Sequence, residues 1–302
     1  MNNSKHYIAG ASAFVIWGFF SIPLRALREY GVGEILYFRI LFAAIVLMLM
    51  IAAFKRGEIR KDIATLKALP RGQRNKMIAL TLIGGVLLIV NWLTFIYIVN
   101  NINIKTASFS YMICPVITAV LGNVLLKEQL SPLQWIAVGL CTLSCILIGI
   151  SSALEMGYSF LTAFTYALYL VSQRRNQGFD RLVILGIQIL FSSLILNLFY
   201  GSLIHQIPDA ASFYWITLVI AVVFTCLPLF LNLYALNKIN SATIGILLYL
   251  NPIINFSIAF IVFKEKIDLT QAVGYGIIIL ALVLFNYPIL KKMQVSMSEK
   301  IT

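Results

Sequence analysis

Long apolar runs separated by short polar stretches dominate the chain. A helix that crosses a hydrocarbon core of about 30 Å needs about 20 mostly apolar residues. Runs of about this length cover residues 7–25, 34–54, 77–99, 104–126, 132–152, 156–173, 182–204, 212–237, 241–263 and 269–290. They are continuous rather than alternating, which argues against the strands of a membrane β-barrel. The pattern predicts an all-α integral membrane protein with ten transmembrane helices.

The composition agrees with this pattern. Of the 302 residues, 61% are hydrophobic and only 11% are charged, and the mean hydropathy is +0.93. A soluble protein of this size needs far more polar groups to cover its surface. The longest connection between the apolar runs, residues 55–76, is too short for a soluble domain. The lipid bilayer is therefore the first predicted partner.

The charges are strongly unbalanced, with 23 Lys and Arg against 11 Asp and Glu and a net charge of +12. In a soluble protein this excess would suggest nucleic acid. Here most of the basic residues fall in alternate loops, including the connection 55–76, as cytoplasmic loops do in membrane proteins. We therefore expect no nucleic-acid partner, and a multi-pass protein of the plasma membrane with both termini in the cytoplasm.

The chain contains an internal repeat. At an ungapped offset of 137, residues 91–150 align with 228–287 and share identical polar, proline and glycine positions. Arg25 and Arg174 correspond more weakly at an offset of 149. Each copy holds five predicted helices, and an odd number inserts the second copy in the opposite direction. We predict inverted repeats over 1–152 and 153–290, followed by a cytoplasmic tail over 291–302.

Arg39 is the formal charge that falls inside a predicted span. It follows Glu34 by five residues, so one interpretation is a snorkelling arginine or one paired with Glu34. The other is an electrostatic anchor at the mouth of a substrate cavity, because charges within membranes usually serve function.

Amide and aromatic side chains also interrupt the spans. Asn251 and Asn255 lie one turn apart and share a helix face. Such groups either bond neighbouring helices or line a cavity. The predicted cavity set is Trp17, Arg39, Asn91, Trp92, Tyr111, Tyr166, Asn232, Tyr249, Asn251 and Asn255.

Two prolines, Pro115 and Pro252, occupy matching positions of the repeat inside apolar runs. Proline removes a backbone donor and bends a helix, and matching interrupted helices point to a midplane site. We expect these prolines to support gating. The same helices end in two matching pairs that are predicted to act as gates or helix-end salt bridges, Lys127 with Glu128 and Lys264 with Glu265.

Other chemistries find little support in the chain. The four cysteines, Cys114, Cys141, Cys145 and Cys226, lie in apolar runs without metal-ligand spacing. The sequence has no phosphate-binding loop and no catalytic triad pattern. We expect no metal, no cofactor and no enzymatic activity. The acidic residues lie near span ends, so facilitated diffusion or exchange is at least as plausible as proton antiport, and the coupling ion stays open.

Several of these residues together resemble a known family. Asn91-Trp92, Asn100-Asn101, Tyr111, Pro115 and the Lys127-Glu128 run resemble the RarD branch of the EamA-type transporters, in the drug/metabolite transporter (DMT) superfamily. The "FVIWGFF" segment (14–20) and the "YFRILFAA" segment also fit that type. The resemblance implies a bacterial plasma-membrane permease with two five-helix EamA-type repeats, in a branch named for chloramphenicol sensitivity. Cys114 departs from this pattern, where Asn is expected.

The leading hypothesis is a secondary transporter of a small metabolite or amphipathic drug-like solute. Alternating access between the two repeats would supply its mechanism. The alternative is a membrane protein that does not transport, such as a lipid-handling enzyme or an assembly subunit that binds a partner. A catalytic form of that alternative needs clustered acid and base residues at an interface, and the loops carry only dispersed charges.

Overall fold

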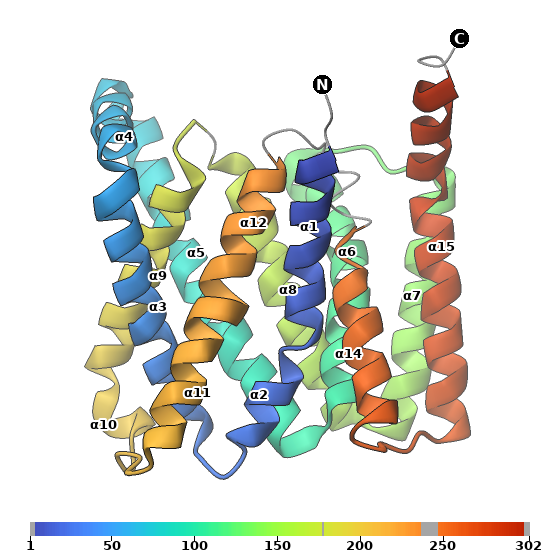
Figure 1. Ribbon diagram of the computed structural model, residues 1–302. Coiled ribbons are helices and arrows are strands. Elements are labelled where there is room, and N and C mark those ends of the chain that lie inside the picture. The colour runs from blue at the N-terminus through green and yellow to red at the C-terminus, as the bar shows by residue number, and fades with distance from the viewer. Residues whose placement is uncertain (1–3, 177, 237–246, 299–302) are drawn as a thin grey trace.

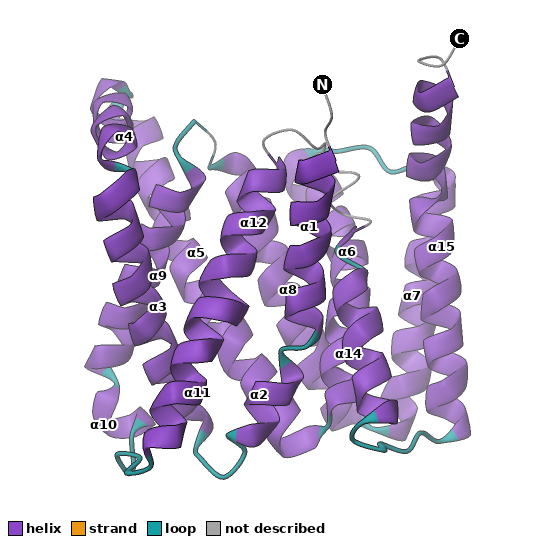
Figure 2. Ribbon diagram, in the orientation of Figure 1, coloured by secondary structure: helices purple, strands orange, loops and turns teal. Residues whose placement is uncertain are grey.

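The computed structural model describes residues 4–176, 178–236 and 247–298, and within these ranges the chain is helical, with no strand (Figure 2). Within these ranges, seven helices or joined helices are long and apolar enough to cross a membrane. They are Lys5–Ala26, Val32–Phe54, Arg71–Ile102, Ile104–Leu126, Arg181–Leu198, Ala211–Asn232 and Leu269–Tyr287. The prediction of an all-helical, multi-pass membrane protein is therefore confirmed.

The helices of the first half run back and forth between two faces (Figure 1). In chain order they are α1 (Ser4–Gly18), α2 (Ser21–Ala26), α3 (Val32–Phe54), α4 (Arg56–Ala68), α5 (Arg71–Tyr97), the π-helix η1 (Ile98–Ile102), α6 (Ile104–Leu126) and α7 (Pro132–Ser151). We call the face where α1 begins the terminal face, because α15 ends there too, and the other the opposite face.

The second half enters from the opposite face, because α8 starts there whereas α1 starts at the terminal face (Figure 1). Its helices are α8 (Ala153–Arg175), α9 (Arg181–Leu198), α10 (Tyr200–Leu203), α11 (Ala211–Ala221), the π-helix η2 (Val222–Cys226), α12 (Leu227–Leu236), α14 (Leu250–Ile261) and α15 (Leu269–Ser298). Helices α7, α8 and α14 run beside the seven apolar spans. The predicted span 241–263 lies partly outside the described residues, so the count of ten stays a prediction.

The connection 55–76, expected as a plain loop, contains the helix α4. None of its residues is buried, and its apolar positions Ile59 and Ile63 recur four apart, as on one face of a helix. Its start is held to α9, because Lys55 Nζ lies 2.8 Å from a carboxylate oxygen of Asp180. The same Asp180 caps α9 by accepting the backbone N–H groups of Leu182 at 2.9 Å and Val183 at 3.1 Å.

The two halves pack mainly against each other. Helix α1 contacts α12 and α14, α3 contacts α9 and α11, α5 contacts α8 and α9, and α6 contacts α8 and α14. The main buried cluster accordingly combines side chains of both halves, such as Leu36 and Ile96 with Phe213 and Ile220. The space between the halves is therefore walled by both repeats, which is where the candidate site lies.

Candidate functional site

A small cavity of about 60 Å³ lies between the halves. One water molecule needs roughly 10–15 Å³ of such volume, so the cavity has room for a handful of waters. Its lining includes six residues of the predicted set, namely Trp17, Arg39, Trp92, Tyr111, Tyr166 and Asn251. Tyr169, another aromatic residue inside a predicted span, also lines it. Sequence reasoning missed the rest of the wall, which includes Phe14, Phe20, Leu88, Phe95, Leu185, Phe224, Thr225, Leu229 and Leu248.

Arg39 is the charged member of this lining and is only 2% exposed. Its guanidinium carbon lies 4.6 Å from the centre of the Phe20 ring and 4.5 Å from that of Trp92. Both distances suit cation–π attraction. The Nε atom donates to Thr225 Oγ1 at 3.2 Å, whereas the buried Nη1 atom has no hydrogen-bond partner among the described residues. One edge of a buried cation is thus left unsatisfied at the cavity.

Arg39 lies on the cavity wall, and the Glu34 pairing that the sequence suggested is not formed among the described residues. Residues five apart on an α-helix are separated by about 140° around its axis, so the two side chains leave different faces. Glu34 is instead directed to the loop at residue 205, where one carboxylate oxygen accepts the His205 backbone N–H at 3.3 Å.

A π-helical turn and a proline build the wall opposite Arg39. Thr225 belongs to η2, and its hydroxyl also donates to the carbonyl of Ile220 at 3.1 Å. In an α-helix the N–H of residue 228 would bond the carbonyl of Phe224, but Pro228 has no N–H. That carbonyl instead accepts the indole N–H of Trp17 at 2.9 Å. The freed carbonyl therefore ties α1 to the second half beside the cavity.

Not every predicted residue lines the cavity. Asn91 is fully buried, donates to the carbonyl of Thr162 at 2.8 Å and accepts the Tyr111 hydroxyl at 3.3 Å. It therefore positions Tyr111 rather than facing the cavity. Tyr249 and Asn255 are buried too, at 9% and 1% exposure, and do not belong to this lining.

A second hollow of about 360 Å³, which we call the vestibule, lies toward the terminal face. Asn232 of the predicted set lines it, together with Gln173, Asn176, Arg181 and Gln188. Tyr166, Tyr169, Leu185 and Leu229 line both hollows and therefore form the wall between them. The rings of Tyr166 and Tyr169 are stacked with their centres 5.9 Å apart.

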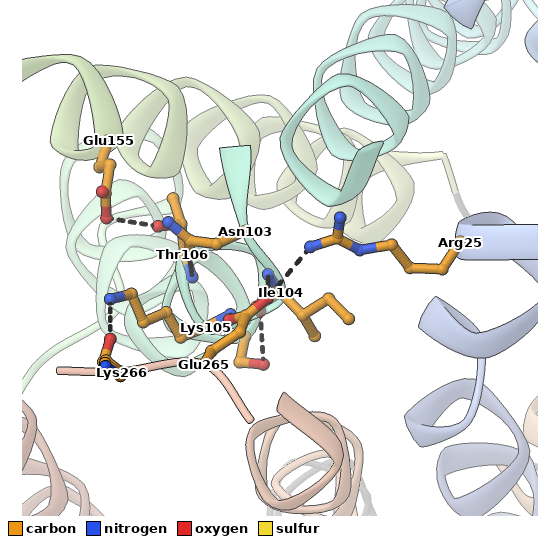
Figure 3. Close-up of polar contacts among 9 residues, drawn as sticks. Arg25, Asn103, Ile104, Lys105, Thr106, Glu155, Glu265 and Lys266 are labelled. Carbon is orange, nitrogen blue, oxygen red and sulfur yellow. Dashed lines mark hydrogen bonds and ion pairs between the residues drawn. The ribbon is translucent and has the colours of Figure 1, made fainter. Parts of the chain in front are cut away.

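An ion pair joins the two halves at the opposite face. Arg25 Nη2 at the end of α2 lies 3.1 Å from Glu265 Oε1, in the loop after α14. Glu265 also accepts the backbone N–H groups of Ile104 at 2.8 Å and Lys105 at 3.0 Å, so it caps the start of α6 (Figure 3). The Lys105 ammonium in turn bonds Gln271 Oε1 at 2.9 Å and the carbonyl of Lys266.

A related ion pair occurs at the terminal face. Arg174 Nη1 at the end of α8 lies 2.9 Å and 3.1 Å from the two carboxylate oxygens of Glu128, in the loop after α6. The side chains are 43% and 46% exposed, against 18% and 11% for Arg25 and Glu265. Each pair joins one half to the other, and the two pairs occupy corresponding positions of the repeat.

The same backbone turn presents both glutamates. Lys127 and Lys264 have left-handed backbones, with φ of 58° and 52°. The following N–H bonds six residues back in each case, from Glu128 to Gly122 at 3.2 Å and from Glu265 to Ala259 at 3.0 Å. Both helices therefore end in the same left-handed turn, which satisfies a carbonyl of the last helical turns. The lysines end the helices, and Arg25 and Arg174 are the ionic partners of the two glutamates.

The two repeat-matched prolines are placed differently. Pro115 lies inside α6, which continues through it as a single helix. Pro252 is the third residue of α14, and this helix begins directly after a turn at Leu248 and Tyr249. Asn251, which lines the cavity, therefore lies in the first turn of α14.

Comparison with known proteins places this arrangement in context. The model of the EamA-like transporter family matches residues 4–150 and 154–287. The chain is 28% identical to the uncharacterized transporter YojE of Bacillus subtilis (strain 168), over 98% of both chains. It is 27% identical to the protein RarD of Streptomyces exfoliatus, over 93% of this chain and 88% of that one. A solved crystal structure shares the fold, with a TM-score of 0.63 at 13% sequence identity over 94% of this chain and 98% of that chain.

Proposed function

Because the chain belongs to the EamA-like transporter family, in its RarD-like branch, we propose that it is a secondary transporter that moves a small metabolite or amphipathic solute by alternating access. The family predicted from the sequence is thereby confirmed. One observation carries the proposed mechanism. The ion pairs Arg25–Glu265 and Arg174–Glu128 link the two halves reciprocally, one at each face.

We propose that the ion pair at the opposite face holds the two halves together more strongly than the one at the terminal face. At the opposite face, Glu265 holds Arg25 and two backbone N–H groups in a partly buried setting. Hydrogen bonds to a charged group contribute about 1.5–3 kcal/mol each. At the terminal face, Arg174 and Glu128 are exposed, and such a pair contributes about 0–1 kcal/mol. The vestibule also lies on that side. In the proposed cycle this conformation is open toward the terminal face, and exchange between the repeats strengthens one pair as the other separates.

The wall between the two hollows, which includes Tyr166 and Tyr169, is the proposed inner barrier. A cavity of about 60 Å³ is far smaller than the roughly 300–1,000 Å³ of sites that enclose small molecules. A solute that enters the vestibule must therefore displace Tyr166 and Tyr169 before it reaches Arg39. We propose that this displacement connects the two hollows into one binding site.

The coupling proposed here does not use a buried carboxylate. Neither the cavity nor the vestibule has an Asp or Glu among its described lining residues. Proton-coupled carriers usually place a titrating carboxylate or histidine on the substrate path. Facilitated diffusion or exchange is therefore the favoured mode. We also propose that the terminal face lies in the cytoplasm, and the basic residues of the α4 region support this under the positive-inside rule.

Cysteine labelling tests alternating access without knowledge of the substrate. In a background lacking the four native cysteines, Asn232→Cys reports on the vestibule and Asn251→Cys on the cavity. A membrane-impermeant thiol reagent is applied to membrane vesicles of each orientation. Glu265→Gln is expected to slow labelling of Asn232→Cys from the terminal face and to speed labelling of Asn251→Cys from the opposite face.

Glu128→Gln is the matched control and should shift both rates the other way, since it weakens the pair at the terminal face. Labelling rates that neither substitution changes would contradict alternating access. That result would support the rival class, a membrane protein that does not transport.

A further inference from the structure

We infer that the cavity binds a monoanionic organic solute, a carboxylate with an aromatic or branched alkyl body, and that Arg39 recognises the carboxylate. This inference rests on the proposed function and names its substrate class. It starts from Arg39, which is only 2% exposed and whose buried Nη1 atom has no hydrogen-bond partner among the described residues.

The protein itself offers this cation no counter-charge at the cavity. The described lining residues include no Asp or Glu, and Glu34 bonds elsewhere. A guanidinium stays protonated at physiological pH, so Arg39 does not relieve its burial by losing a proton. Contacts with Phe20 and Trp92 compensate part of the cost of burial, but they leave the Nη1 edge without an acceptor. A bound anion would supply that acceptor.

The geometry also indicates how the anion would bind. The two aromatic rings lie close to the guanidinium carbon, and Thr225 Oγ1 accepts a hydrogen bond from Nε. A planar guanidinium forms its strongest contacts edge-on with a carboxylate or phosphate. The Nη1 edge can therefore bond an incoming anion, while the contacts with Phe20, Trp92 and Thr225 hold the guanidinium group in place.

Charge counting distinguishes between anions. Arg39 is the single Lys or Arg among the described residues that line the cavity. A phosphate ester, with about two negative charges near neutral pH, would bring more charge than this site balances. A carboxylate brings one. The vestibule adds Arg181 and, among its described lining, no acidic residue, so both hollows disfavour cationic solutes.

The rest of the wall determines the body of the solute. Trp17, Trp92, Tyr111 and Tyr166 present aromatic surface, and Asn251 adds one amide. The hydroxyl of Tyr111 and the indole N–H of Trp17 are already bonded, to Asn91 and to the carbonyl of Phe224. Few polar groups therefore remain for the body, which is why an apolar one is favoured.

Two sets of matched compounds test the inference, in which only the charge of the head group changes. The first is 3-phenylpropionate, 3-phenylpropionamide and 3-phenylpropylamine, and the second is 4-methylvalerate with its amide and amine. Binding to the purified full-length protein is measured by thermal stabilisation, because a ligand of the native state raises the unfolding temperature. In at least one set, the carboxylate should bind about 10- to 100-fold more tightly than its amide, as a hydrogen bond to a charged group implies. The amine should bind least.

Arg39→Gln should abolish this preference, and Arg28→Gln is the control, since Arg28 is exposed at the opposite face. If Arg39→Gln does not fold, Thr225→Val serves instead, and it should reduce the preference while keeping the charge. The inference is overturned by equal binding of carboxylate and amide, by tightest binding of an amine, by no carboxylate binding, or by a preference that survives in Arg39→Gln. The labelling test is done without ligand, so it can still support transport when the anion test fails.

Discussion

Arg25 and Glu265 are 240 residues apart in the chain, yet their side chains meet at 3.1 Å and join the end of α2 to the loop after α14. Arg174 and Glu128 repeat this relationship at the other face, with the roles of the two halves exchanged. Two helices that end in the same left-handed turn thus present the same carboxylate to the same kind of arginine. Each half therefore contributes the arginine to one pair and the glutamate to the other.

The two pairs should respond differently to exchange of their charges. Arg174→Glu with Glu128→Arg should restore most of the stability that either single change removes, because that pair is exposed and simple. Arg25→Glu with Glu265→Arg should not, because an arginine at 265 cannot accept the N–H groups of Ile104 and Lys105. Thermal unfolding in detergent checks both double variants. Equal rescue at the two faces would show that capping of α6 adds nothing.

A second prediction concerns Thr225, which holds Arg39 without supplying charge. Thr225→Val removes the acceptor for Nε and should weaken carboxylate binding by about 2- to 10-fold, the equivalent of a hydrogen bond of about 0.5–1.5 kcal/mol. Thr225→Ser keeps the hydroxyl and should retain most of the affinity. Titration by thermal stabilisation measures both. Equal loss in the two variants would point to packing of the threonine methyl group instead.

The sequence predicted the location of the elements well, because a lipid-facing helix is apolar all along its own length. It also singled out six residues of the cavity wall, since buried polar groups are rare in such spans. The two Lys-Glu pairs were singled out too, but each glutamate pairs with an arginine of the other half and not with the neighbouring lysine. Helix α4 was missed because a search for long apolar runs does not detect a short amphipathic helix. In that segment the spacing of Ile59 and Ile63 was the available signal.

The remaining features depend on neighbours that are distant in the chain. Asn91 and Asn251 look alike as amides within apolar runs, but Asn91 is satisfied by Thr162 and Tyr111, whereas Asn251 lines the cavity. Which amide is satisfied depends on packing between helices, and no local pattern reports it. The π-helical turn at Thr225 also depends on tertiary packing. Pro228 does predict from the sequence that the carbonyl four residues earlier lacks its helical partner.

That carbonyl supports a third prediction. Trp17→Phe removes the donor to the carbonyl of Phe224 and should lower the free energy of unfolding by about 1–3 kcal/mol, the cost of an unsatisfied buried acceptor. Pro228→Ala returns an N–H to the helix and should reduce this cost in the double variant. Thermal unfolding of the two single variants and the double variant forms the cycle. Strictly additive effects would mean that the proline does not free the carbonyl.

The last prediction concerns pH and the anchor of α4. Burial acts to raise the pKa of Asp180, but the hydrogen bond from Lys55 and the backbone N–H groups of Val183 and Leu182 outweigh it, so the pKa lies below its ordinary value of 3.8. A carboxyl group with a lowered pKa stabilises the fold above its unfolded pKa, and this contribution is lost as the pH falls through the folded value.

Asp180→Asn keeps an acceptor for the helix cap but removes the charge, so it should destabilise the protein by about 0.3–1 kcal/mol near pH 7, the usual range for an acidic residue at a helix N-terminus. The deficit relative to wild type should stay constant down to about pH 5 and shrink as the pH falls below 3.8, where the wild-type carboxyl also becomes neutral. Unfolding midpoints of both proteins across this range provide the measurement, with Asp209→Asn, a change at an exposed aspartate, as the control. A deficit that is the same at all pH values would assign the effect to side-chain geometry rather than to the charge that holds Lys55.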